Sequence, residues 1–129
     1  MSMIDSPKTE ALSRFLDVEV ARYKLIASNL ANIDTPGFRT RDLDFRAELA
    51  RAGAHAGGSE EGGLAYASYT PVVRHVRGLM QRPDGNDVSP ERESLLLAET
   101  QMKYNLGVQL LKGHFHQISA AITSGGTSS

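Results

Sequence analysis

The 129-residue sequence contains no cysteine. Disulfide bonds, zinc sites built on thiolates and cysteine nucleophiles are therefore all excluded. This absence fits either a reducing compartment or an exported protein without disulfides, so it does not fix the location. Tryptophan is also absent, aromatic residues make up 6% of the chain and hydrophobic residues 40%. The length corresponds to about one domain, and this composition is thin for a compact core.

The sequence also lacks an excess of charge of one sign. Fourteen Lys and Arg residues stand against fifteen Asp and Glu residues, which gives a formal net charge of −1. We expect no nucleic-acid partner, because no basic stripe is present that would bind a phosphate backbone. No stretch approaches the ~20 apolar residues that a membrane span needs, and no apolar core of a cleavable secretory signal is visible. We therefore expect a soluble chain without direct membrane insertion.

Motifs for catalysis or metal binding are missing too. His114 and His116 suggest a metal site, but positions i and i+2 of a helix point about 200° apart, so one ion cannot bind both. Asp84 and Asn86 resemble the start of a calcium loop, but its twelfth position is Leu95 rather than Glu. No phosphate loop, Rossmann glycine pattern or G-x-S-x-G string occurs. We expect no metal, no cofactor and no enzymatic activity.

A long helix is predicted from about Pro7 to Asn32. Ser6 can cap it, and Pro7 suits the first helical position. Thr35-Pro36-Gly37 ends it, because the residue before proline avoids the α region and glycine accepts a positive φ. Apolar residues at alternating spacings of four and three predict a narrow stripe along one side. The stripe consists of Leu12, Leu16, Tyr23, Ile26, Leu30 and Ile33, with Glu19 as its one polar member.

A second long helix is predicted after the turn signal Pro83-Asp84-Gly85-Asn86. It opens at Ser89-Pro90, with carboxylates in the first turn where they favour the helix dipole. It should end near Ser124, before a disordered tail at residues 125–129. Its stripe, with Gln101 as a polar member, consists of Leu97, Tyr104, Val108, Leu111, Phe115, Ile118 and Ile122.

The middle of the chain, residues 38–83, is less regular. A short helix is predicted within Asp42 to Ala52, and residues 53–63 form a Gly-rich loop with almost nothing to bury. Two short strands, Leu64 to Tyr69 and Val72 to Val76, could pair with each other. The predicted fold is mainly α, with the terminal parts 1–37 and 84–129 packed as a coiled-coil-like hairpin around a small, irregular middle region.

The heptad-like stripes favour helix-to-helix packing, and they are wider than one seam. We expect the stripes to form an assembly seam and the remaining apolar residues to seek partners on neighbouring subunits. These remaining residues are Phe15, Val18, Val20, Leu25, Leu95, Leu96, Leu106 and Leu110.

The most informative stretch is the end of the first helix. Asn29-Leu30-Ala31-Asn32, followed by Thr35-Pro36-Gly37-Phe38, is a well-made helix stop, because Asn bonds nearby backbone groups while Pro and Gly shape the bend. Asn29 and Asn32 could cap the helix carbonyls or form hydrogen bonds across a subunit contact, and both readings stay open. As a whole, this string after a helix of some twenty-five residues resembles the signature of the bacterial flagellar rod and hook family.

Further segments are similar to the proximal-rod members of that family. They are Arg39-Thr40-Arg41-Asp42-Leu43-Asp44-Phe45, and Asp84-Gly85-Asn86-Asp87-Val88 leading into a helix with Glu93, Glu99 and Tyr104. The short length suits those members too, since hook and distal-rod proteins carry larger inserted domains. The Gly-rich loop at residues 53–63 and the Ser89-Pro90 helix start depart from the family pattern.

The resemblance implies a structural subunit of an axial tube that crosses the periplasm and transmits motor torque. Its terminal helices would form the inner coiled-coil layer, and the middle region would lie outside. The partners implied are copies of the same chain, other rod proteins and the basal-body adaptor at the export gate. Export would use the flagellar type III gate without a cleaved signal. An alternative, a small helical-hairpin adaptor or secretion chaperone, explains the stripes but not the Asn29–Phe38 string.

Overall fold

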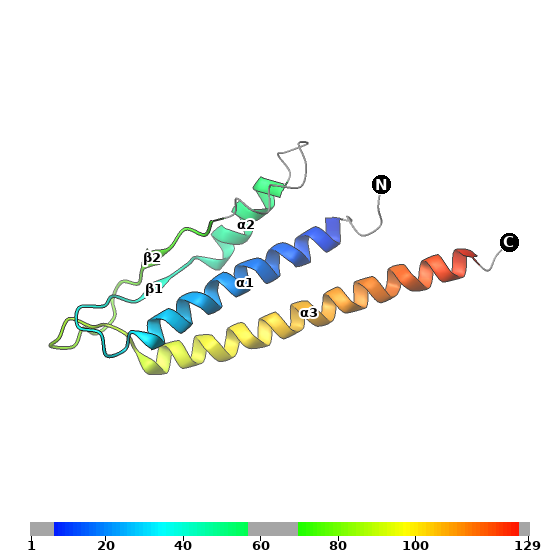
Figure 1. The fold of residues 1–129 in the computed structure, drawn as a ribbon. Coiled ribbons are helices and arrows are strands. Elements are labelled where there is room, and N and C mark those ends of the chain that lie inside the picture. The colour runs from blue at the N-terminus through cyan, green and yellow to red at the C-terminus, as the bar shows by residue number, and fades with distance from the viewer. Residues whose placement is uncertain (1–6, 57–69, 127–129) are drawn as a thin grey trace.

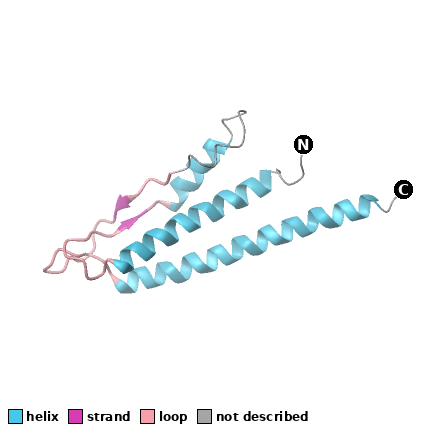
Figure 2. Ribbon diagram, in the orientation of Figure 1, coloured by secondary structure: helices cyan, strands magenta, loops and turns pink. Residues whose placement is uncertain are grey.

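The computed structural model describes residues 7–56 and 70–126 of the chain. Within them, the elements follow in the order α1 (Pro7–Ala31), β1 (Arg41–Asp42), α2 (Phe45–Ala56), β2 (Arg74–His75) and α3 (Pro90–Gly126). Figure 2 shows that helices dominate and that the two strands form a small ribbon. The prediction of a mainly α fold with two long terminal helices is confirmed.

Helices α1 and α3 lie side by side in opposite directions and form a hairpin (Figure 1). With 25 and 37 residues, they are about 38 and 55 Å long at 1.5 Å per residue. Helix α3 therefore continues well beyond Pro7, the first described residue of α1. Figure 1 also shows that α2 and the strands lie on the other side of α1 from α3, so α1 is the central element.

The hairpin is closely packed where α3 carries Gly107. A Cβ atom at this position would lie 2.8 Å from Cδ2 of Leu16 and 3.0 Å from the ring of Phe15. Phe15 in turn meets Phe45, the first residue of α2, edge to face with ring centroids 5.5 Å apart. Lys103 of α3 places its Nζ 5.0 Å from the centroid of the same Phe45 ring. These contacts tie all three described helices together.

The buried core is small and unusually polar. Among the described residues, the buried hydrophobic side chains are Val18, Ile26, Leu43 and Val88. Twice as many polar or charged residues are buried: Glu19, Asn29, Thr40, Glu48, Asn86, Asp87, Glu93 and Thr100. Buried polar groups stabilise a fold only when their hydrogen bonds are made, so specific side-chain bonds decide much of this architecture.

The helix boundaries follow local capping. Ser89 Oγ accepts a hydrogen bond of 3.2 Å from the backbone N–H of Arg92, and Pro90 occupies the first helical position, as predicted for α3. Asp44 Oδ1 accepts a bond of 3.2 Å from the N–H of Ala47 and caps α2 in the same way. Helix α2 therefore begins at Phe45, later than the predicted Asp42.

Two helices, α2 and α3, extend further toward the C-terminus than predicted. Helix α2 runs to Ala56 and so includes the first part of the predicted Gly-rich loop, whose remaining residues 57–63 lie outside the described chain. Helix α3 runs to Gly126 rather than Ser124, so the predicted tail begins later. Glycine costs a helix about 1 kcal/mol relative to alanine, which weakens the last turn without stopping it.

The observed strand pairing was not among the predictions. β2 lies within the predicted strand Val72–Val76, but it pairs with β1 in antiparallel register, Arg41 opposite His75 and Asp42 opposite Arg74. The other predicted strand, Leu64–Tyr69, lies outside the described residues. Val18 is a second correction: it was expected to seek an outside partner, yet it is completely buried within the subunit.

Candidate functional site

The Asn29–Phe38 string forms a structured turn at one end of the hairpin. Asn32 donates from Nδ2 to the carbonyl of Ser28 over 2.8 Å and so caps the end of α1. Asn32 also accepts a bond of 3.1 Å at Oδ1 from the hydroxyl of Thr35. Gly37 has φ +75°, a left-handed conformation that glycine adopts without steric penalty. Asn32 thus takes the first of the two roles considered for it.

Asn86 fastens this turn to the loop that precedes α3. Its side chain is completely buried, and Nδ2 donates to the carbonyls of Asn32 and Thr35, each over 2.9 Å. Its Oδ1 accepts a bond of 2.8 Å from the N–H of Val88. Both N–H donors of this amide are used, which fixes asparagine rather than aspartate at the position.

Further backbone contacts extend the same junction. The N–H of Gly37 donates to the carbonyl of Asp84 over 2.8 Å, and Asp87 Oδ1 accepts a short bond of 2.6 Å from the N–H of Thr40. A Cβ at Gly85 would lie 3.2 Å from the Cα of Gly37, so the two loops touch backbone to backbone. We call residues 32–40 and 82–88 together the turn clasp.

Asn29 joins α1, β1 and α3 at a single buried point. Its Nδ2 donates to the carbonyl of Arg41 over 2.8 Å and to Oε2 of Glu93 over 3.0 Å. Its Oδ1 accepts a bond of 3.1 Å from the N–H of Arg41. Asn29 therefore has a third role, a tertiary bond within the subunit, which neither of the two open readings contained.

Charged side chains surround this point and form a polar network. The carboxylate of Asp42 accepts two hydrogen bonds from Arg22 of α1, over 3.3 and 3.2 Å, and one from Arg92 of α3, over 3.0 Å. Arg92 also donates to Oε1 of the buried Glu93 over 2.6 Å. Sequence reasoning missed Arg22, Asp42 and Arg92, because each is an ordinary surface residue by type and only the fold brings them together.

The remaining signature residues lie around the turn. Asn29 is buried and Leu30 half-buried, while Phe38 is half-buried at the exit from the turn. Asn32 and Ile33 are also half-buried, and the exposed positions of the string are Ala31, Asp34, Thr35, Pro36 and Gly37.

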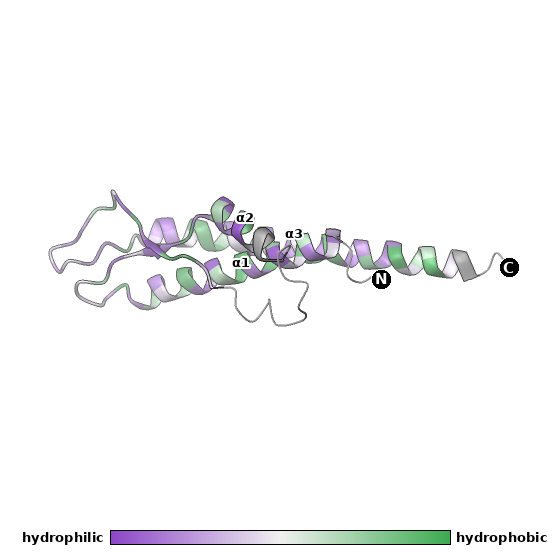
Figure 3. Ribbon diagram, turned by 90° about the horizontal axis from the view of Figure 1, so that it is seen from above, coloured by the Kyte–Doolittle hydropathy of each residue, from purple (hydrophilic) through white to green (hydrophobic). Residues whose placement is uncertain are grey.

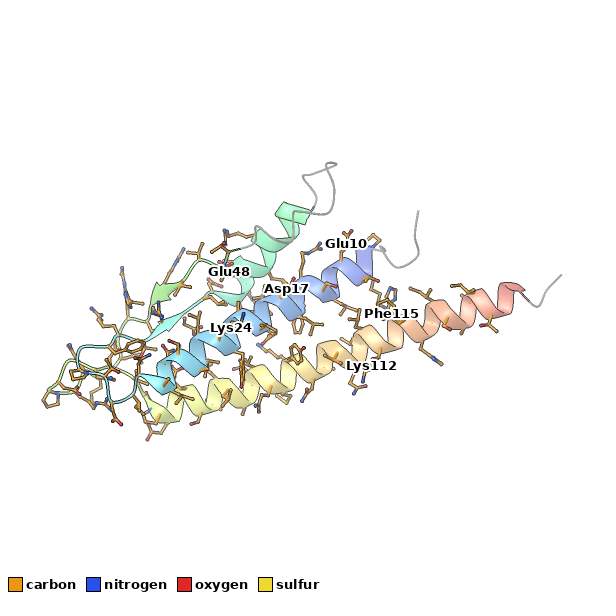
Figure 4. All side chains as sticks on the ribbon, viewed as in Figure 1. Glu10, Asp17, Lys24, Glu48, Lys112 and Phe115 are labelled. Atoms are coloured by element: carbon orange, nitrogen blue, oxygen red, sulfur yellow. The ribbon has the colours of Figure 1, made fainter. Side chains whose placement is uncertain are left out.

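The predicted seam residues differ in how far they are buried within the subunit. Ile26 is buried, and six are half-buried: Leu12, Leu16, Leu97, Val108, Leu111 and Ile118. Four are exposed: Tyr23, Tyr104, Phe115 and Ile122. Figure 4 places Phe115 on α3 near the start of α1, and Ile122 lies still further along the helix. The stripe thus holds the hairpin together and continues past it.

A second apolar stripe runs along α3 outside the seam, and two of its members, Leu106 and Leu110, border a groove that Leu12 and Phe15 of α1 also line. Leu95, Met102, Leu106 and Leu110 follow helical spacing and share one face. All four are exposed, Leu95 to 70% and Met102 to 67%. Figure 3 shows hydrophobic and hydrophilic residues interspersed along α3 as far as its C-terminal part. The described part of the chain has no helix with the length and hydropathy of a membrane span.

The histidines do not belong to a metal centre in the described residues, which contain no group of three or more His, Asp or Glu side chains suited to an ion. The described part of the chain offers structured turns, buried polar bonds and exposed apolar stripes. This arrangement is suited to packing against other proteins.

Comparison with known proteins identifies the family. Residues 19–39 match the model of the family described as "Flagella basal body rod protein". The flagellar basal body rod protein FlgB of Salmonella typhimurium is 33% identical over 109 residues, covering 74% of this chain and 78% of the relative. This chain belongs to the flagellar basal body rod protein family.

Other rod proteins align over more of the chain. FlgB of Escherichia coli is 29% identical over 134 residues, which cover 92% of this chain and 97% of that protein. FlgB of Borrelia hermsii is 31% identical over 124 residues, with 84% and 90% covered. The expectation of a structural subunit of the flagellar rod, first drawn from the Asn29–Phe38 string, is confirmed. The matched residues 19–39 span the C-terminal half of α1 and the turn that follows it, including Asn29 and Gly37.

Proposed function

We propose that this rod protein is a building block of the proximal rod, assembled through its terminal helices into an axial tube that transmits motor torque. The observation that carries the proposal is the exposed apolar stripe Leu95, Met102, Leu106 and Leu110, on a long helix whose seam already packs against α1. Contiguous exposed apolar surface marks a protein–protein contact site.

The subunit would be divided as the sequence suggests. Residues 1–37 and 84–129 form the axial core, and residues 38–83 lie outside it. The half-buried seam residues hold the hairpin, whereas the exposed Tyr23, Tyr104, Phe115 and Ile122 contact neighbouring subunits. The turn clasp fixes the angle between α1 and α3, so that each subunit presents the same faces to its neighbours.

The partners we propose are copies of this chain, other rod proteins and the basal-body adaptor at the export gate. The rod would span the periplasm, and the chain would reach it through the flagellar type III gate without a cleaved signal. A role as an enzyme is not proposed, because the buried side chains of Asn29, Asn86 and Glu93 are bonded within the subunit rather than directed at a substrate.

The test starts with deletion of the gene in its source organism, scored by soft-agar motility and by electron microscopy of basal bodies. We expect a non-motile strain without complete rods, restored by the wild-type gene on a plasmid. A fully motile, flagellated deletion strain would contradict the proposal.

Two variants then test the stripe itself. Leu106→Glu adds a charge on an exposed site and should leave subunit folding unchanged within about 0.5 kcal/mol, yet abolish motility because the charge would be buried unpaired on assembly. Ser94→Glu adds the same charge at an exposed position of α3 that lies about 120° around the helix from Leu106, and it is the matched control, expected to swim. Normal motility of the Leu106→Glu strain would exclude the stripe as an assembly contact.

A further inference from the structure

A hollow between α1 and α3 contains an unpaired buried carboxylate. The hollow has a volume of about 340 Å³ and is lined by Glu19, Val20, Tyr23, Thr100, Gln101, Tyr104 and Asn105. Glu19 is 1% exposed, yet neither of its side-chain oxygens receives a hydrogen bond from the described residues. The hydroxyl of the buried Thr100 is likewise without a bond there. A buried charge without a partner is strongly unfavourable.

The nearby cations of the subunit are bound elsewhere. Arg22 of α1 pairs with Asp42, and Lys103 of α3 pairs with Glu99 over 2.9 Å. These charges act on Glu19 from a distance only. Burial raises the pKa of Glu19 above its ordinary value, Lys103 and Arg22 oppose the rise, and Glu99 adds to it. The described residues of the subunit supply no hydrogen-bond donor to Glu19.

The hollow has room for a side chain. A water molecule occupies about 30 Å³ in the liquid, so the volume is that of roughly ten waters. Tyr23 and Tyr104 line it with half-exposed rings, which suit the apolar stem of a long side chain, and Glu19 belongs to the same lining. Lysine is built in this way, with a flexible apolar stem and a compact cationic head.

We propose that the Glu19 hollow binds a lysine side chain from a terminal helix of a second copy of this chain. The proposal rests on the proposed function and names one contact within that assembly. The terminal helices carry three exposed lysines, Lys8, Lys24 and Lys112, and none of them forms an ion pair within the described residues. Figure 4 shows Lys24 on α1 and Lys112 on α3, both on the subunit surface.

The contact fits an open assembly. Donor and acceptor lie at different places on the subunit, so the contact can also form head to tail, and repeated head-to-tail contacts generate rings or helical filaments. The charge complementarity also explains why a costly carboxylate stands in the middle of the seam. The free-energy cost of burying the unpaired Glu19 in each subunit is reduced when a neighbouring subunit docks.

The first experiment compares Glu19→Gln with the matched control Glu10→Gln, a partly exposed carboxylate of the same helix. Glutamine keeps the shape and removes the charge. We expect Glu19→Gln to raise the melting temperature of the purified subunit while lowering the yield of complete basal bodies roughly tenfold or more, because a desolvated lysine loses its counter-charge. Glu10→Gln should change neither quantity.

A higher melting temperature together with a lower yield of basal bodies distinguishes a docking role of Glu19 from a structural role within the subunit. A Glu19→Gln subunit that melts lower would show that the carboxylate is bonded within its own subunit, and one that assembles normally would show that no neighbour needs it. Either result overturns the proposal. Assembly is judged in a deletion strain that the wild-type gene restores, whereas melting is measured on the purified subunit, so failure of that restoration would refute the proposed function separately.

The second experiment identifies the occupant by disulfide trapping. Because the chain has no cysteine, it can form a disulfide in assembled rods only through an introduced cysteine. Gln101→Cys at the hollow is combined in turn with Lys8→Cys, Lys24→Cys or Lys112→Cys, and basal bodies are oxidised. We expect one pair to give a ladder of linked subunits, since trapping requires Cα atoms within about 7 Å. Gln101→Cys with Arg77→Cys is the control pair, and absence of a ladder from all three lysine positions would overturn the proposal.

Discussion

The amide of Asn29 in α1 donates to the carboxylate of Glu93 in α3 over 3.0 Å, and both side chains are buried. The same Asn29 bonds both backbone groups of Arg41 at the start of β1. A single side chain thus connects the two terminal helices to the middle region.

Removal of this amide should be costly. Asn29→Ala leaves the Glu93 carboxylate and the two Arg41 backbone groups without their partner, and each unmet buried group costs about 1–3 kcal/mol. We expect a loss of about 3 kcal/mol in the free energy of unfolding, measured by urea denaturation. Asn32→Ala, which removes a half-buried cap, should cost about 1 kcal/mol. Equal losses for both variants would contradict the central role of Asn29.

Replacement of Asn86 by aspartate should destabilise the subunit. Its Nδ2 donates to the carbonyls of Asn32 and Thr35, whereas a carboxylate would place a buried negative charge against these two acceptors. We expect Asn86→Asp to lose about 3 kcal/mol or more of stability and to expose the turn clasp to proteolysis. The same change of amide to acid at the exposed Gln109 should be close to neutral, and a stable Asn86→Asp variant would show that the clasp is not needed.

Gly37 and Gly113 provide a test of backbone conformation. Neither site has atoms within 4 Å of an added Cβ, but Gly37 has φ +75° and Gly113 lies in regular helix. Gly37→Ala should therefore cost about 1–2 kcal/mol, and the β-branched Gly37→Val more, while Gly113→Ala should gain up to about 1 kcal/mol. A Gly37→Val protein with unchanged urea midpoint and normal assembly would argue against a left-handed Gly37.

Gly107 and Gly113 test the close approach of the hairpin helices. Both lie in α3, but a side chain at 107 would collide with Phe15 and Leu16, whereas one at 113 meets open space. We expect Gly107→Leu to destabilise the subunit by about 1–3 kcal/mol and Gly113→Leu to be neutral or stabilising. Thermal melts followed by circular dichroism would measure both, and similar melting temperatures would mean that α1 and α3 are further apart than described.

The raised pKa of Glu19 predicts a specific pH dependence. Because its pKa in the folded subunit lies above the ordinary 4.5, the folded state holds the proton to higher pH than the unfolded state. The wild type therefore loses stability as the pH rises from 4.5 through the folded pKa, and the loss is complete above it. Glu19→Gln lacks this term, so its stability advantage over the wild type should grow with pH and then level off.

Urea titrations of both proteins from pH 4.5 to neutral would measure the difference. Burial also raises the pKa of Asp17, and the hydrogen bond from Lys103 lowers the pKa of Glu99. These groups are present in both proteins and cancel to first order in the difference. An advantage that shrinks as the pH rises would mean that Glu19 is stabilised as a carboxylate within the subunit.

The long helices were predictable because their signals are local. Pro7, Ser89 and Pro90 mark the helix starts through capping and fixed φ, and the alternating spacing of apolar residues depends on neighbours within a few turns. The family was predictable for a similar reason, since the Asn29–Phe38 string is continuous in the sequence.

The tertiary bonds were not predictable in this way. β1 and β2 have two residues each, too few for any alternation to show, and their pairing depends on how α2 folds back. Asn29 was considered as a cap or as a contact between subunits, because the sequence does not show that Arg41 and Glu93 meet at its side chain. Val18 was placed outside the core since its burial depends on the elements that cover α1 opposite α3.

The bonds between the two long helices are gathered at the turn end of the hairpin. For α1 to slide along α3 by one helical turn, about 5.4 Å, the bonds from Asn86 to Asn32 and from Asn29 to Glu93 must break together. A force along the helix axis therefore acts on these bonds at the same time rather than on one bond after another. The subunit is mechanically strongest against sliding at this end, and a twisting force that enters through α3 passes to α1 there.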